Sequence, residues 1–400
     1  MRAGAAGACC VAVGLWAGGL GGHAAAQQRL LPEDFLSPAS APHVAVAGDG
    51  TAAVVFAVAD EVWCALSRDG GTSFAAPVRV GASGELEAGL SRGPRVAVTA
   101  DSIAVVAVCG QRLRGEDGDL LCWRSADRGA TWSQPVRIND VEGAAREGLH
   151  ALAAGPRGVL ISVWLDLRNA VHAPGQPPSG GTELWAAWSD DGGATWSEDA
   201  ALYRSPDGTI CECCAPAVAV DPLAGHALVF WRNKLGGNRD MYALTVKRGE
   251  TPDAAKALAV DPEHWSLEAC PMAGGGVAVS ASGTPLTFWR RESSLYSTTH
   301  STGPEPGVVQ TIDEGRETAA AAGPGGFHLV WTDGEGQVMT AFDSYDSKER
   351  RAAGLGRGYN TAVAGAPDGQ GPVIAVWETG ERGAEALRVA LLAERKTEQN

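Results

Sequence analysis

Basic clusters and long apolar segments are both scarce in this chain of 400 residues. Its 32 Lys and Arg residues are outnumbered by 47 Asp and Glu residues, which gives a formal net charge of -15. No run of Lys or Arg offers a surface for phosphates, so nucleic acid and anionic membrane surfaces are not expected partners. Beyond the N-terminus no segment is apolar over the length that a bilayer requires, and no membrane span is predicted.

The N-terminal segment differs from the rest of the chain. One Arg precedes a run of small apolar residues, and three alanines precede Gln27. This pattern is typical of a secretory signal peptide, and we predict cleavage near Ala26. The mature protein is then expected to be secreted or periplasmic, where disulfides are permitted. Cleavage would remove Cys9 and Cys10 and leave seven of the nine cysteines.

A repeated strand pattern fills most of the mature chain. A strand of small apolar residues is followed by a turn and by a second strand that often ends in Trp. Seven such units begin at His43, Arg95, His150, Ala217, Gly276, Thr318 and Asn360. With strand-only content, this period predicts an all-β fold, a β-propeller in which each unit is one blade with strands a to d. A β-sandwich, the alternative fold, does not explain the period.

Three segments share a second pattern, S-x-D-x-G-x-[ST]-[FW]. They are SRDGGTSF (Ser67–Phe74), SADRGATW (Ser125–Trp132) and SDDGGATW (Ser189–Trp196). The Asp accepts backbone N–H bonds in a tight turn, and the Gly takes a positive φ. This pattern resembles the Asp-box, or BNR repeat, of sialidases and related β-propellers. Asp69, Asp127 and Asp191 are therefore expected to be structural.

The resemblance covers nearly all of the mature chain. Sialidase-like domains have six blades, whereas the repeat count favours seven, so a propeller of six or seven blades is predicted. We expect a signal peptide at residues 1–26, an N-terminal lead-in at 27–42, one propeller domain at 43–395 and a C-terminal tail at 396–400. A monomer is expected.

Propeller geometry predicts where a ligand would bind. In an antiparallel blade the start of strand a and the end of strand b lie on one face, and the Asp-box turns lie on the other. These positions converge on one mouth of the central channel, where propellers commonly bind ligands. The residues at these positions are His43, Arg95, His150, Cys214, Cys270, Met272, Glu317 and Tyr359 at strand a, and Asp60, Asp166, Arg168, Arg232, Arg290 and Glu378 at strand b.

The sialidase resemblance implies a particular site: an arginine triad for the substrate carboxylate, a Tyr nucleophile helped by Glu, and an Asp acid/base. Ser40 stands where the first arginine of the triad would be expected. The remaining catalytic candidates are Tyr359, Arg232, Arg290, Asp60 and Asp166. The alternatives are that the two arginines are solvated charges at the rim and that Tyr359 serves packing.

The most unusual segment is TICECCAPAVAV (Thr209–Val220), which holds three cysteines within four residues. Cys270 and Met272 occupy the same place before the next unit, in an adjacent blade. We therefore expect Cys211, Cys213, Cys214, Cys270 and Met272 to lie close together. Soft thiolate and thioether ligands select copper(I) or zinc over hard cations, and His150 could add an imidazole.

Three interpretations of the cysteines remain open. A disulfide between Cys270 and one loop cysteine fits an oxidising compartment. One disulfide would leave two loop thiols unexplained, which favours a metal or redox site. The third interpretation is that the cysteines serve packing alone, but packing does not require three thiols within four residues. A disulfide or a shared metal requires the Cys270 sulfur to lie within about 7 Å of a loop sulfur.

Three functions follow from these observations. The first is an exported sialidase-like propeller that binds a glycan, another small ligand or a soft metal at its channel mouth, without sialidase turnover. The second is an exo-glycosidase of the sialidase type. The third is a structural platform for interactions.

Overall fold

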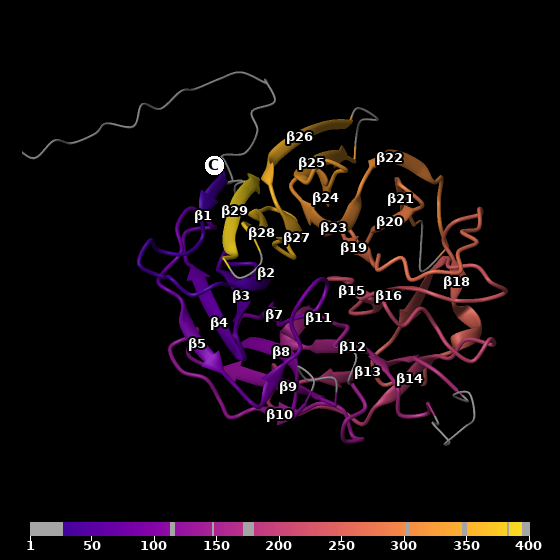
Figure 1. Cartoon of the computed structure of the whole chain (residues 1–400), viewed down its shortest axis with the longest axis horizontal. Coiled ribbons are helices and arrows are strands. Elements are labelled where there is room, and N and C mark those ends of the chain that lie inside the picture. Colours follow the sequence, from indigo (N-terminus) through magenta and orange to yellow (C-terminus); the bar gives the residue numbers. More distant parts are fainter. Residues whose placement is uncertain are drawn as a thin grey trace, which may run out of the picture.

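A computed structural model describes residues 27–112, 117–145, 148–170, 180–300, 305–345, 350–381 and 384–393. The predicted signal peptide and C-terminal tail lie outside the described residues. Within the described residues the strands form seven sheets, which stand as blades around a central axis (Figure 1). The predicted all-β propeller is confirmed, and it has seven blades. The described part of the chain contains no helix with the length and apolar character needed to span a membrane.

The first three blades carry the Asp-boxes. Blade 1 consists of β2 (Ser40–Val46), β3 (Ala52–Val58), β4 (Glu61–Ser67) and β5 (Val78–Gly81). Blade 2 consists of β7 (Arg95–Val98), β8 (Ile103–Gly110), β9 (Asp119–Ser125) and β10 (Val136–Arg137), and β6 (Glu85–Leu86) pairs with the end of β8. Blade 3 consists of β11 (His150–Ala154), β12 (Leu160–Asp166), β13 (Glu183–Ser189) and β14 (Ala200–Tyr203).

The other four blades complete the ring. Blade 4 consists of β15 (Ala217–Val220), β16 (Ala227–Arg232), β17 (Met241–Val246) and β18 (Leu258–Ala259). Blade 5 consists of β19 (Gly275–Val279), β20 (Pro285–Arg291), β21 (Ser294–Thr299) and β22 (Gln310–Glu314). Blade 6 consists of β23 (Arg316–Gly323), β24 (Gly326–Thr332), β25 (Gln337–Ser344) and β26 (Arg350–Arg357). Blade 7 contains β27 (Tyr359–Gly365), β28 (Val373–Thr379) and β29 (Ala386–Ala393).

The hydrophobic core lies between the blades. The second strand of each blade is covered on both faces by neighbouring sheets, so it reads as a nearly continuous apolar run, such as IAVVAVCG in β8. Large aromatic side chains fill the space between neighbouring sheets. Fully buried tryptophans near the ends of second strands are Trp164, Trp231, Trp289, Trp331 and Trp377. Burial of each such ring contributes roughly 4–6 kcal/mol of transfer free energy.

The ring is closed by the start of the described chain. Strand β1 (Gln27–Arg29) pairs with β29 and is the outermost strand of blade 7. Leu30 and Leu31, the next two residues, are buried in the apolar cluster between blades 7 and 1. Part of the segment expected as a lead-in is thus built into the propeller.

The Asp-boxes follow the third strands and have the expected turn geometry. The Asp191 carboxylate accepts hydrogen bonds from the backbone N–H (2.9 Å) and hydroxyl (2.6 Å) of Thr195. Asp69 and Asp127 make the same contacts with the residue four positions later. Gly193 has a φ of 94° and lies against blade 2, where a Cβ would come within 3.1 Å of the Cys122 sulfur. These contacts support a structural role for the three aspartates.

Candidate functional site

A channel of ≈ 350 Å³ runs along the axis, lined by the innermost strands. Alanine, valine and glycine form most of its wall, and His43, Arg95, Glu317 and Asn360 bring polar groups to it. The Arg95 guanidinium donates to the backbone oxygens of Ser91 (2.8 Å) and Pro94 (3.1 Å). Burial, with the nearby charge of Arg95, holds the pKa of His43 well below its ordinary value, so this imidazole is neutral.

The carboxylates of Glu317 and Glu378 bind Asn360, near the start of the first strand of blade 7. The Asn360 backbone N–H donates to Glu317 Oε2 (2.6 Å), and its side-chain amide donates to Glu378 Oε1 (2.5 Å). Burial raises the pKa of both glutamates. Glu317 and Asn360 have φ values of 58° and 54°, a left-handed conformation that is costly for these residues and is maintained by the hydrogen bonds.

Tyr359, the predicted nucleophile, lies beside one of these glutamates. Burial and the negative charge of Glu378 raise the pKa of Tyr359 to about 12. The sialidase resemblance implies a nucleophilic tyrosine paired with a glutamate, and Glu378 stands beside Tyr359. The raised pKa keeps the phenol of Tyr359 protonated at neutral pH, and its role as a nucleophile stays a prediction.

The two predicted substrate-binding arginines contact backbone oxygens. Arg232 is 1% exposed, and its guanidinium donates to the carbonyls of Ala273 (2.9 Å), Arg239 (2.6 Å) and Arg290 (2.7 Å). The guanidinium of Arg290 donates to the carbonyl of Glu292. Neither is among the described residues that line the channel. Arg232 is thus a bridge between blades 4 and 5.

The two candidate acids are held at separate places. Asp166 is fully buried and accepts from Trp164 Nε1 (2.8 Å) and from Arg168 Nη2 (2.7 Å), which forms a buried ion pair. Asp60 is exposed and accepts from the backbone N–H of Leu86 (3.1 Å). The five catalytic candidates thus contact different local partners, and their catalytic role stays a prediction.

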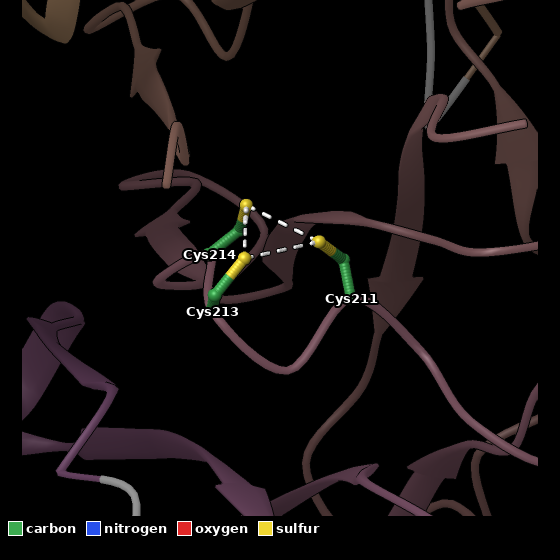
Figure 2. A group of neighbouring side chains, drawn as sticks. All are labelled: Cys211, Cys213 and Cys214. Atoms are coloured by element: carbon green, nitrogen blue, oxygen red, sulfur yellow. Dashed lines mark hydrogen bonds between the residues drawn. The ribbon is translucent and has the colours of Figure 1, made fainter. Parts of the chain in front are cut away.

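The cysteines, in contrast, come together. Cys211, Cys213 and Cys214 lie in the loop before β15, and their sulfurs face one another (Figure 2). The Cys211 sulfur is 3.3 Å from that of Cys214 and 3.7 Å from that of Cys213, and the remaining pair is 3.8 Å apart. Cys270, from the loop before β19, forms a disulfide with Cys213. The predicted proximity of Cys270 to the loop is confirmed.

The two loops also contact each other through their backbones. At Gly274 a Cβ would come within 2.5 Å of the Ala215 carbonyl oxygen, so only glycine allows this approach. The backbone N–H of Cys211 donates to the Arg232 carbonyl (3.1 Å), which fixes the loop to the end of β16. Adjacent blades therefore position the four sulfurs without relying on the disulfide alone.

Positive charge surrounds the free thiols. Arg239 Nη1 donates to the Cys211 sulfur (3.2 Å). The hydrogen bond with Cys214, together with the charges of Arg239 and Arg232, lowers the pKa of Cys211 to about 6, while burial raises that of Cys214. Arg239 was not expected from the sequence. Its only signal is its place in the loop after β16, on the same face as the cysteines.

The structure also places His150 and Met272, two predicted partners of the cysteines. The ring nitrogens of His150 lie 3.0 Å from the Gly148 carbonyl oxygen and 3.2 Å from that of Val106. The ring therefore turns toward blade 2, whereas the cysteine loop belongs to blade 4, and a role for His150 as a metal ligand stays a prediction. Burial lowers its pKa to about 4. Met272 is 46% exposed and lines the channel.

Comparisons with known proteins bear on the fold. No family model and no curated protein matches the sequence. A solved alpha-L-arabinanase of Penicillium chrysogenum, complexed with arabinobiose, is 14% identical with a TM-score of 0.50, over 94% of this chain and 99% of that one. A Trypanosoma rangeli sialidase in complex with 2,3-difluorosialic acid is 12% identical with a TM-score of 0.51, over 93% of this chain and 59% of that one. The fold is that of a sialidase-like β-propeller. At such identities the likeness extends to the fold alone.

Proposed function

We propose that this sialidase-like propeller is exported and binds a soft metal ion, copper(I) or zinc, through its cysteine cluster. The observation that carries the proposal is the spacing of the Cys211, Cys213 and Cys214 sulfurs, at 3.3, 3.7 and 3.8 Å. Sulfurs that share a tetrahedral zinc ion at about 2.3 Å lie about 3.8 Å apart. After reduction of the Cys213–Cys270 disulfide, the loop would present three sulfurs close to the spacing of one face of such a site, and Cys270 would supply a fourth.

The surroundings support this chemistry. Soft thiolates prefer copper(I) and zinc to calcium or magnesium. Cys211 and Cys214 are buried, so water competes poorly for the ligand positions. Arg239 donates to one sulfur, and such second contacts orient ligands and offset thiolate charge. A site of four thiolates would carry excess negative charge with either metal. The positive charges of the neighbouring Arg232 and Arg239 reduce this excess.

Glycoside hydrolysis, the alternative, receives less support. Its basis is the fold that this chain shares with an arabinanase and a sialidase. The tyrosine, arginines and aspartates that the reaction would need are engaged with the local partners described above. The channel, with Arg95 and His43 at its wall, is where a glycan or another small ligand would bind.

Metal loading tests the proposal. The protein is reduced, freed of reductant without oxygen, exposed to copper(I) or zinc, gel-filtered and analysed for metal. We expect about one metal per chain in the wild type and loss of that metal in Cys211→Ser/Cys214→Ser. Cys64→Ser, at a buried free thiol in β4, is the matched control and should retain the metal. No retained metal in the wild type, or full retention in the double variant, would overturn the proposal.

Export is tested separately. Removal of a signal peptide near Ala26 would leave a chain that begins close to Gln27, the first residue of β1. N-terminal sequencing of protein recovered outside the cytoplasm should give this start. An intact Met1 on a cytoplasmic product would contradict export.

A further inference from the structure

The cluster contains both a disulfide and two free thiols. Cys213 and Cys270 are bonded, whereas Cys211 and Cys214 are free. The thiolate is the form of cysteine that binds metals, so a sulfur within a disulfide is not available as a thiolate ligand. In this oxidation state the cluster offers two thiols to a metal, and after two-electron reduction it would offer four.

The four sulfurs differ in their access to solvent. Cys270 is exposed and Cys213 is half-buried, while Cys211 and Cys214 are buried, at 0% and 1% exposure. Thiol–disulfide exchange requires the attacking sulfur to reach a disulfide sulfur. An external thiol therefore reaches the disulfide at Cys270, and the two inner thiols stay shielded.

We propose that the Cys213–Cys270 disulfide is a redox gate on the metal site, opened by an external dithiol and closed by an external disulfide. This inference rests on the proposed function. One thiolate of the dithiol attacks Cys270 Sγ, so a mixed disulfide forms and Cys213 leaves as a thiolate. The second thiol of the dithiol then attacks its own partner sulfur, which releases Cys270 and yields the oxidised dithiol.

The exchange balances without any further reactant. Two electrons pass from the dithiol to the protein, and the protons of the dithiol are released to water or taken up by Cys213 and Cys270. Metal binding to the four sulfurs then displaces thiol protons. The reverse exchange with an oxidised partner reforms the Cys213–Cys270 bond and removes two ligands, which weakens metal binding.

The fold keeps the four sulfurs together when the disulfide is open. From the end of β16 in blade 4, the Arg232 guanidinium donates hydrogen bonds to the carbonyls of Ala273 and Arg290 in blade 5. The contact of Gly274 with Ala215 holds the two loops at short distance. Reduction therefore frees ligands without separating the loops, which a gate on a preformed site requires.

The test compares metal affinity before and after reduction. Wild-type protein, as isolated and after treatment with dithiothreitol and its removal, competes for copper(I) with a chromogenic chelator under anaerobic conditions. Iodoacetamide labelling with mass mapping should show two new adducts after reduction, at Cys213 and Cys270. We expect reduction to tighten copper(I) binding at least about tenfold, because two further thiolates become available.

A matched variant isolates the gate. In Cys213→Ser/Cys270→Ser, checked by labelling to hold Cys211 and Cys214 as free thiols and by circular dichroism to be folded, reduction should leave the affinity unchanged. The control Cys64→Ser should respond to reduction like the wild type. Equal copper(I) binding by the wild type before and after reduction would overturn the gate and leave the metal site intact. Absence of binding in both states would overturn the metal function and the gate with it.

Discussion

Arg232 shows at the scale of one residue how a buried cation can serve the architecture. Its guanidinium has no carboxylate partner among the described residues and instead donates to three carbonyl oxygens, while its Cζ lies 4.9 Å from the ring centre of Trp265. A planar group with five donors suits this geometry, whereas a lysine ammonium does not. The residue links the end of β16, in the blade that follows the cysteine loop, to the loop and blade that follow Cys270.

Replacement of this arginine should therefore affect both stability and the site. We expect Arg232→Lys to lower the free energy of unfolding by about 2–4 kcal/mol, because two carbonyl oxygens lose their donors in a buried place. Urea denaturation measures the change, and metal affinity should fall with it. Arg290→Lys, at a half-buried position with one backbone contact, should cost less than about 1 kcal/mol. Equal losses in the two variants would contradict the bridging role.

Ser40 leads to a second prediction, because it stands where the first arginine of the sialidase triad would be expected. Without that guanidinium, a substrate carboxylate loses a charge-assisted hydrogen bond. We expect release of sialic acid from a fluorogenic sialoside to stay at background, and Tyr359→Phe to leave that rate unchanged. Efficient release that the substitution abolishes would contradict this prediction.

At the scale of elements, the Asp-box turns give a prediction about pH. The hydrogen bonds from the Thr131 hydroxyl and backbone N–H, with that from Ser125, lower the pKa of Asp127 from 3.8 to about 2. A lowered folded-state pKa means that the charged form contributes stability above pH 3.8, and that this contribution is lost as the pH falls toward 2. The melting temperature of Asp127→Asn should lie below that of the wild type at pH 6, and the difference should shrink toward pH 2. A difference that stays constant would contradict this account.

The same turns should be independent of the cysteine site, because they lie on the opposite face of the propeller. Asp191→Ala removes the acceptor for the backbone N–H groups of Ala194 and Thr195. We expect a lower melting temperature and unchanged metal affinity of the folded protein. Loss of metal binding at an unchanged melting temperature would show that the assignment of the two faces is wrong.

The sequence predicts the elements better than it predicts the directions of side chains. Each repeat unit carries a periodic pattern of apolar residues that specifies its strands, and seven such units predict seven blades. The Cys214 and Cys270 loops are predicted to be adjacent because they occupy the same position in consecutive units. The side chain at a strand start has no such periodic constraint. His150 turns to the carbonyl of Val106 in the preceding blade, and Arg232 is buried between two blades. Both outcomes depend on backbone oxygens that no sequence pattern marks.

At the scale of the whole molecule, the ring depends on a strand of three residues. Gln27–Arg29 pairs with β29, so the last blade receives its outer strand from the other end of the chain. The short first segment therefore pairs with the outer edge of β29 and joins the two ends of the described chain. A residue pattern of this length carries too little periodic signal to be recognised as a strand before the ring is known.

Closure of the ring gives the last prediction. A chain that begins at Pro32 lacks β1 and also Leu30 and Leu31, which are 4% and 5% exposed in the cluster between blades 7 and 1. Burial of a leucine side chain contributes about 1.5–3 kcal/mol, so the loss should be on the order of 3–6 kcal/mol. The control is a chain that begins at Gln27, which corresponds to the protein after the predicted removal of residues 1–26. Equal unfolding midpoints in urea for the two chains would show that the ring does not need this strand, whereas a lower midpoint for the shorter chain supports closure by β1.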